Sequence, residues 1–275
     1  MGLIDKKKVM RSFGRQAAEY DGHSAVQKRV VEHLVELLHK ENLIPVRLLD
    51  IGAGTGMLLR RMKELYPEAR RVGIDLAPEM CRMAQRNVQA KHTHFVSADA
   101  ERLPFADAAF DLVLSTSTLQ WLNSLDLAFA EAFRVLAPGG LFCFAMFGGK
   151  TLFELKDSYR LALAASGRTK ADRSHLFFSA KDVEEALVRA GFLRPFSCSE
   201  MFLDSHEDVP ALLRSLKKIG AGNASPLASE GLAGRKVMLE MIDIYRRTHG
   251  KDGFIPATYE VIFAMGRKPL GSVMK

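Results

Sequence analysis

The stretch that most constrains the fold is an apolar run followed by three alternating glycines. Residues 46–51 are mostly apolar and lead directly into Gly52, Gly54 and Gly56, and a pattern with helical spacing follows over residues 57–65. This order predicts a buried parallel strand, a tight turn and a helix. Glycines let a ligand approach the backbone closely. The N-terminus of the following helix offers unpaired N–H groups to a negatively charged group. An ordinary strand-to-helix turn would show the same local pattern, so the neighbouring strands decide the matter.

Polar residues follow the next predicted strands at the points where those strands end. Residues 71–75 indicate a second strand ending in Asp75, residues 94–99 a third ending near Asp99, and residues 110–115 a fourth. Because open parallel sheets bind ligands at the carboxyl ends of their strands, we expect these aspartates to lie beside the glycines, together with Ser115 and Thr116. Asp75 stands at about the spacing that an acid on ribose hydroxyls requires. Taken singly, each aspartate would also fit a helix cap or a solvated loop.

The glycine spacing favours one kind of nucleotide over others. A dinucleotide fingerprint has its third glycine where this chain has Met57, and no phosphate-cradling G-x-x-x-x-G-K-[ST] loop is present. The pattern of a hydrophobic residue, Asp50, a hydrophobic residue and G-x-G-x-G resembles motif I of class I S-adenosylmethionine-dependent methyltransferases. Later stretches of that family are matched by residues 98–100, 110–113 and 134–140.

That resemblance implies an α/β fold of Rossmann-like type. We expect a seven-stranded, mostly parallel sheet with an antiparallel last strand and a helical lid insertion. It implies S-adenosyl-L-methionine as cofactor, with Asp75 on the ribose, Ala100 and Met80 near the adenine, and Tyr20 closing over the methionine part. The predicted cofactor-binding residues are Tyr20, Asp50, Gly52, Gly54, Gly56, Asp75, Leu76, Met80, Asp99, Ala100, Ser115 and Thr116.

Composition bounds the class of protein. A chain of 275 residues with 48% hydrophobic content predicts one large domain with insertions. The three cysteines are widely separated, which argues against disulfides and metal sites. No stretch is long enough to span a membrane, and the N-terminus lacks the apolar core of a signal peptide, so we expect a cytoplasmic protein. A mitochondrial presequence is only weakly supported, since Asp5 and Glu19 interrupt the basic N-terminal stretch. We also expect a monomer. The formal net charge of +7 suggests an acidic partner or merely a basic surface.

The order of the predicted elements suggests three parts. Residues 1–42 form a helical segment over the cofactor cleft. Residues 43–204 and 254–270 form the cofactor-binding core, with a lid segment at about 150–178. Residues 205–253 form a helical insertion that selects the acceptor. Within the core, Ser179 and Asp182 predict the start of a helix that ends at Gly191.

The residues supply no convincing general base for methyl transfer. The eight histidines do not stand out at the strand ends, and neither an N-P-P-Y motif nor a Pro-Cys pair is present. A carboxylate acceptor fits this absence, because it is already ionised at neutral pH and needs only to be positioned.

Four further stretches extend the resemblance over almost the whole chain. Residues 13–20 (FGRQAAEY), 119–121 (LQW), 213–221 (LRSLKKIGA) and 255–260 (IPATYE) are similar to the malonyl-acyl-carrier-protein O-methyltransferases of biotin synthesis. This resemblance implies esterification of the free carboxyl of malonyl-acyl carrier protein, or of malonyl-coenzyme A. It implies no nucleic-acid partner and no membrane insertion. Since acyl carrier proteins are acidic, the basic residues would steer docking. Tyr20, Lys217 and Arg173 are the candidates for positioning the acceptor.

Other functions share the same cofactor half. A methyltransferase acting on a quinone or another small molecule would need a more apolar acceptor pocket. A related mitochondrial assembly factor acts on a protein arginine, and a non-enzymatic cofactor-binding module would lack an acceptor channel. A nucleic-acid methyltransferase would want base-stacking aromatics, for which Trp121 alone is thin support.

Overall fold

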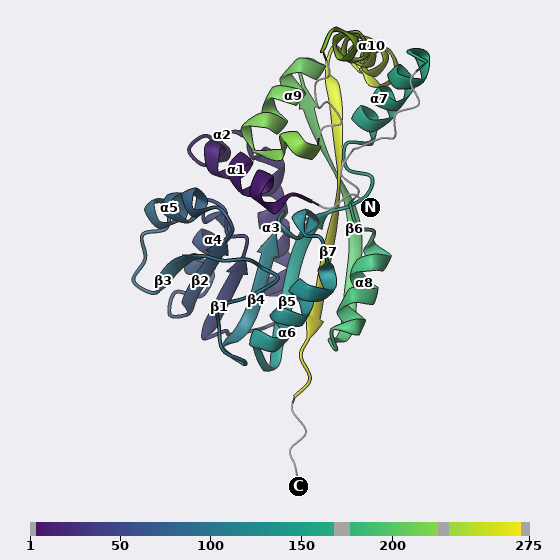
Figure 1. Cartoon of the computed structure of the whole chain (residues 1–275). Coiled ribbons are helices and arrows are strands. Elements are labelled where there is room, and N and C mark those ends of the chain that lie inside the picture. Colours follow the sequence, from purple (N-terminus) through teal and green to yellow (C-terminus); the bar gives the residue numbers. More distant parts are fainter. Residues whose placement is uncertain (1–3, 168–176, 225–230, 271–275) are drawn as a thin grey trace.

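A computed structural model of the chain describes residues 4–167, 177–224 and 231–270. Its centre is a seven-stranded sheet in the order β3-β2-β1-β4-β5-β7-β6 (Figure 1). The strands β1 to β5 are parallel, and β7 runs antiparallel to both of its neighbours, β5 and β6. The predicted mostly parallel sheet with an antiparallel last strand is therefore confirmed. The strands are β1 (Arg47–Ile51), β2 (Arg70–Asp75), β3 (Thr93–Ser97), β4 (Phe110–Thr116), β5 (Leu136–Phe147), β6 (Leu193–His206) and β7 (Ile255–Arg267).

Helices cover both faces of this sheet. The central strands are buried on both sides, which is why β1, β4 and β5 are continuous apolar runs. On one face, α3 (Ala25–His39) and α4 (Met57–Leu65) join a core cluster with β1, β4 and β5. On the other face, α6 (Leu125–Val135) and α8 (Ala180–Arg189) pack on inward side chains of the same strands. The predicted start of α8 is confirmed, because Ser179 and Asp182 form a reciprocal capping box.

Three helical pieces precede the first strand. They are α1 (Lys6–Gln16), α2 (Tyr20–His23) and α3, and α1 lies against α5 (Pro78–Asn87). The predicted helical character of the first forty residues is thus confirmed, with breaks around residues 17–19 and at Ser24. In Figure 1, α1 and α2 stand above the upper ends of the parallel strands, where the ligand site is expected.

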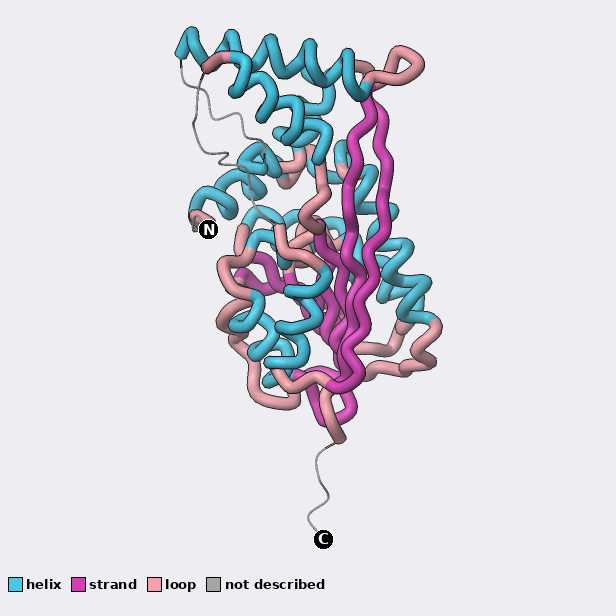
Figure 2. The backbone as a smooth tube through the Cα atoms, turned by 90° about the vertical axis from the view of Figure 1, so that its right-hand side faces the viewer, coloured by secondary structure: helices cyan, strands magenta, loops and turns pink. Residues whose placement is uncertain are grey.

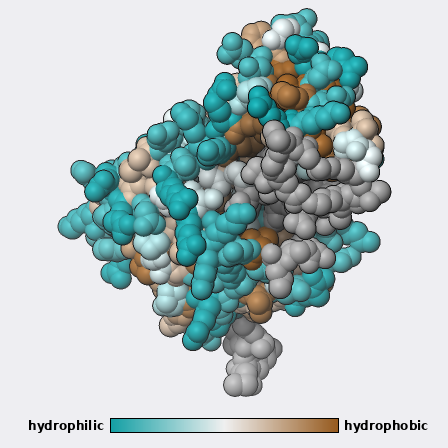
Figure 3. All heavy atoms as spheres, turned by 45° about the horizontal axis from the view of Figure 1, so that its top comes forward, coloured by the Kyte–Doolittle hydropathy of each residue, from teal (hydrophilic) through white to brown (hydrophobic). Residues whose placement is uncertain are grey.

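The last two strands are long, with 14 residues in β6 and 13 in β7. They pair with each other from Leu193↔Arg267 to His206↔Ile255, so they continue past β5 as a two-stranded ribbon (Figure 2). The ribbon carries a helical cap made of α7 (Phe153–Ala165), α9 (Val209–Lys218) and α10 (Gly231–His249). Hydrophilic residues cover most of the face seen in Figure 3, while apolar side chains are exposed on the cap. Among the described residues of the cap helices, the exposed large hydrophobic side chains are Phe153 and Leu161 on α7 and Leu239 on α10.

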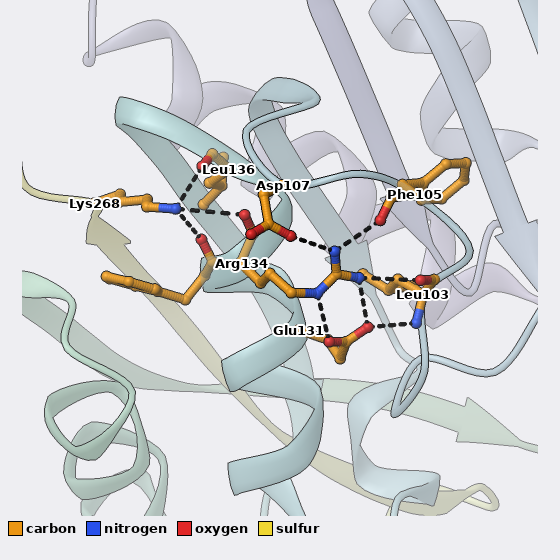
Figure 4. Close-up of polar contacts among 8 residues, drawn as sticks. Leu103, Phe105, Asp107, Glu131, Arg134, Leu136 and Lys268 are labelled. Carbon is orange, nitrogen blue, oxygen red and sulfur yellow. Dashed lines mark hydrogen bonds and ion pairs between the residues drawn. The ribbon is translucent and has the colours of Figure 1, made fainter. Parts of the chain in front are cut away.

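The loop after Asp99 is held by a polar network centred on Arg134 of α6 (Figure 4). The Arg134 guanidinium donates to the carbonyl oxygens of Leu103 and Phe105 and pairs with Asp107 and Glu131. Hydrogen bonds from the Arg134 guanidinium lower the pKa of the Glu131 carboxyl. This network fixes the segment that leads away from the ligand edge of β3.

Candidate active site

The glycine turn has the backbone geometry that its composition predicts. Gly52, Gly54 and Gly56 have φ values of +76°, +55° and +86°, a region that L side chains rarely adopt. A Cβ added at Gly52 would lie 2.1 Å from Thr118 Oγ1, so this position also requires the absence of a side chain. At Gly54, by contrast, no heavy atom of the described residues lies within 4 Å of an added Cβ. The turn therefore packs tightly on the protein side and leaves open space at Gly54.

Asp75 links the turn to the end of β2. Its carboxylate accepts hydrogen bonds from the backbone N–H groups of Gly54 at 3.0 Å and Ala77 at 2.8 Å. Burial raises the pKa of Asp75 to about 6, although these two hydrogen bonds oppose the shift. Each carboxylate oxygen has a second lone pair, so Asp75 can accept hydroxyl donors from a ribose as well.

Asp50 lies behind the turn at the end of β1. It is fully buried, and neither of its carboxylate oxygens has a hydrogen-bond partner among the described residues. Burial, together with the charge of Asp75, raises the pKa of Asp50 to about 8. An uncompensated buried acid of this kind suits a site that receives a cation.

A cavity of about 760 Å³ opens over the turn. Of the predicted cofactor-binding residues, nine line it: Tyr20, Gly52, Gly54, Asp75, Leu76, Met80, Asp99, Ala100 and Thr116. Three others lie behind its wall. Asp50 and Ser115 are buried, with Ser115 Oγ donating to the carbonyl of Ile51, and Gly56 caps the N-terminus of α4.

Lys6 is a charged lining residue that the sequence did not indicate. From α1, its ammonium group reaches Asp99 at 2.6 Å and Glu101 at 2.5 Å. Burial alone would lower the pKa of Lys6, but its hydrogen bonds to the two carboxylates raise it overall. This contact ties the N-terminal helix across the cavity to the end of β3. A lysine run at the start of an amphipathic helix gave no signal of such a pairing.

A second cavity of about 430 Å³ adjoins the first. The two cavities share Phe13, Tyr20, Ser117 and Trp121. The Phe13 ring lies 5.5 Å from that of Trp121 and 6.4 Å from that of Tyr20, measured between centroids, so aromatic rings form much of this junction. The helical cap contributes Leu216 and Ile219. Trp121 therefore lies between the cofactor cavity and the second cavity.

The lining of the second cavity is apolar or neutral. Its described polar members are glutamine, serine, threonine and tyrosine side chains, without a carboxylate, histidine, lysine or arginine. Burial is the main cause that raises the pKa values of Tyr20 and Tyr259, so both phenols are neutral around pH 7. Among these described residues, the cavity accordingly holds no group suited to act as a general base near pH 7.

Of the two basic residues predicted to position the acceptor, the structure describes one. Lys217 is exposed on α9 and lines neither cavity, because the buried face of this helix is formed by Val209, Leu212 and Leu216. The structure therefore does not bring Lys217 to either cavity, and its role in positioning the acceptor stays a prediction. Arg173 lies outside the described residues.

Within the described ranges, no group of three or more histidine, cysteine or acidic side chains is arranged to hold a metal ion. None of the helices in the described part of the chain is long and apolar enough to cross a membrane.

Comparison with known proteins places this site in context. A profile described as "Methyltransferase domain" matches residues 49–144. A malonyl-[acyl-carrier protein] O-methyltransferase of Geobacter sulfurreducens is 51% identical, covering 97% of this chain and 100% of the relative. One from a Methylovorus species is 38% identical, covering 98% and 92%. The solved YcgJ protein of Bacillus shares the fold at 21% identity with a TM-score of 0.59, covering 87% of this chain and all of that one.

Proposed function

We propose that this chain, which belongs to the family of malonyl-[acyl-carrier protein] O-methyltransferases, esterifies the free carboxyl of a malonyl thioester on acyl carrier protein. This is an early step of biotin synthesis. The chain is a methyltransferase, and S-adenosylmethionine is its methyl donor. The carboxyl acceptor is supported above all by the second cavity, which adjoins the cofactor cavity yet contains no base among its described lining residues.

The first cavity fits S-adenosylmethionine. The open space at Gly54 admits a ligand against the backbone, and Asp75 offers free lone pairs to the ribose hydroxyls. A cationic ligand nearby would favour the ionised form of Asp50, whose pKa burial raises. The bound sulfonium supplies an activated methyl group, and the protein has to align the acceptor with it and exclude water. Alignment of the acceptor and exclusion of water fall to the aromatic side chains where the two cavities meet, which are Tyr20, Phe13 and Trp121.

A carboxylate acceptor suits the electrostatics of the second cavity. It needs no deprotonation, so the absence of a base from the described lining costs nothing. When a carboxylate oxygen bonds to the methyl carbon, the carbon–sulfur bond breaks and its electron pair stays on sulfur, so a negative and a positive charge disappear together. A cavity of low polarity favours this loss of charge, because it solvates the separated ions poorly.

The carrier would dock on the helices around the second cavity. Phe13 of α1 and Leu216 of α9 line that cavity, and both helices carry exposed basic side chains. Those exposed residues are Lys7, Lys8, Arg11, Arg15, Arg214, Lys217 and Lys218. An acidic carrier is drawn to such a rim by long-range attraction. We assign Lys217 to this docking. Tyr20 stays our candidate at the transferred methyl, and Arg173 stays a candidate for contact with the malonyl group.

We further propose that the chain acts as a monomer in the cytoplasm, without nucleic acid or membrane insertion. The basic rim supports a protein partner, because it surrounds a cavity lined by apolar and neutral residues rather than a stack of exposed aromatics.

The proposed function is tested by incubating the protein with S-adenosylmethionine and malonyl-acyl carrier protein. Mass spectrometry should show one added methyl on the malonyl form and none on an acetyl-carrier control, which lacks the free carboxyl. Binding of S-adenosylhomocysteine without transfer to the malonyl form would contradict the proposal.

A further inference from the structure

Ser117 is the polar residue at the junction of the two cavities whose side chain the fold leaves unused. Its Oγ atom is buried and has no hydrogen-bond partner among the described residues. The residue lines both the cofactor cavity and the second cavity. A buried hydroxyl without a partner loses free energy relative to water, so its retention at this point calls for a ligand that accepts its hydrogen bond.

The backbone of Ser117 is fixed in an unusual conformation. Its φ is +53°, a value that is costly for a residue with a side chain. Its N–H donates to the carbonyl of Ala145 at 2.8 Å, and its carbonyl accepts from Gln120 Nε2 at 2.6 Å. Both main-chain polar groups are therefore engaged by neighbouring elements. The hydroxyl is left as the group that Ser117 can offer to a ligand.

The residues that line the second cavity indicate which ligand could accept this hydrogen bond. Among its described residues, the second cavity offers an entering carboxylate only neutral hydrogen-bond donors. A neutral hydroxyl suits this task, because it orients one carboxylate oxygen without forming an ion pair.

We propose that Ser117 Oγ–H donates a hydrogen bond to the malonyl carboxylate and positions it at the junction for attack on the methyl carbon. This role rests on the proposed function. The hydroxyl keeps its proton throughout. The attacking oxygen forms its bond to carbon, the carbon–sulfur bond breaks, and sulfur retains the electron pair. Ser117 is thus a positioning residue that distinguishes a free carboxylate from an acyl end without one.

Two substitutions separate the hydroxyl from the backbone. Ser117→Ala removes the hydroxyl and keeps the strained φ, whereas Ser117→Gly removes the hydroxyl and relieves the strain. Ser158→Ala is the matched control, because Ser158 Oγ is also buried and unpartnered within the described residues but lies on α7 and lines neither cavity. Each protein is assayed for transfer to malonyl-acyl carrier protein, S-adenosylhomocysteine affinity and thermal unfolding.

Both Ser117 variants should lose about tenfold to a hundredfold in kcat/KM for the malonyl carrier, the range expected for one hydrogen bond to a charged group. Their S-adenosylhomocysteine affinity should match the wild type, and Ser158→Ala should retain full activity. Unchanged kcat/KM in both variants would overturn the role of Ser117. So would a parallel loss of cofactor affinity, or recovery of activity in Ser117→Gly. A wild type that binds S-adenosylhomocysteine but leaves the malonyl carrier unmodified would overturn the proposed function itself, and the Ser117 role with it.

Discussion

Gly52 is the position where substitution by alanine should do the most local damage. An alanine at its φ of +76° costs about 1–2 kcal/mol in backbone strain. The new Cβ would also lie 2.1 Å from Thr118 Oγ1 and 2.2 Å from its methyl carbon, so Thr118 must move. Moving it breaks the one hydrogen bond that the Thr118 hydroxyl donates, which is shared between the carbonyls of Gly52 and Thr116 and contributes about 0.5–1.5 kcal/mol. Gly52→Ala should therefore destabilise the protein by about 1.5–3.5 kcal/mol in all.

Alanine substitutions at two other glycines separate the cost of backbone strain from the cost of steric overlap. Gly253 has a φ of +80° with open space around an added Cβ, and it lies in the turn before β7, outside both cavities. Gly253→Ala should cost only the strain of about 1–2 kcal/mol and leave cofactor binding unchanged. Gly54→Ala should show a similar stability loss, but its Cβ enters the cofactor cavity, so S-adenosylhomocysteine affinity should fall at least about tenfold.

Urea unfolding and calorimetric titration of S-adenosylhomocysteine measure the two effects separately. The stability order should be wild type, then Gly253→Ala and Gly54→Ala together, then Gly52→Ala. If Gly52→Ala proves no less stable than Gly253→Ala, the packing of Thr118 against the turn does not constrain that glycine, and the reasoning fails.

Three further predictions follow from the charged residues. Since burial raises the pKa of Asp75 to about 6, its carboxylate becomes protonated as the pH falls through that value. S-adenosylhomocysteine affinity should therefore drop between about pH 7 and 5. Calorimetric titrations that show the same drop in Asp75→Asn would contradict this prediction. The pKa of Asp50 is about 8 in the folded protein and about 4 unfolded, so ionising it costs stability as pH rises through this window. In urea unfolding, the free energy of unfolding of Asp50→Asn relative to that of the wild type should increase by up to about 1.4 kcal/mol per pH unit. A difference that stays constant with pH would refute the raised pKa of Asp50. Lys217→Glu should raise KM for malonyl-acyl carrier protein about threefold or more at low salt and leave malonyl-coenzyme A turnover unchanged, whereas equal effects on both substrates would exclude a docking role.

Much of the cofactor site was predictable because its signals are local. The glycine turn can be recognised from a few consecutive residues, and Asp75 stands at the end of a short stretch predicted to be a strand. Parallel strands bring their carboxyl ends to one edge of a sheet, so recognising the strands was enough to predict that Gly54, Asp75 and Asp99 lie around one cavity.

Features that depend on tertiary contacts were less predictable, in both cavities. Lys6 meets Asp99 from a position 93 residues away in the chain, which no local pattern encodes. The free hydroxyl of Ser117 results from a backbone fixed by Ala145 and Gln120, although its place just after the fourth strand was a usable signal. The exposure of Lys217 agrees with the apolar spacing of α9, because that spacing places Leu216 on the buried face of the helix and Lys217 outside it.

The central claim is that the transferred methyl becomes a carboxyl ester, and the lability of that bond tests it most directly. The protein is incubated with S-adenosylmethionine labelled in its methyl group and with malonyl-acyl carrier protein, and the isolated carrier is then treated with mild base. The account predicts that the label leaves the carrier as volatile methanol, with no label on an acetyl carrier treated in parallel. Label that stays on the carrier after base treatment would show transfer to nitrogen or carbon and would contradict the account.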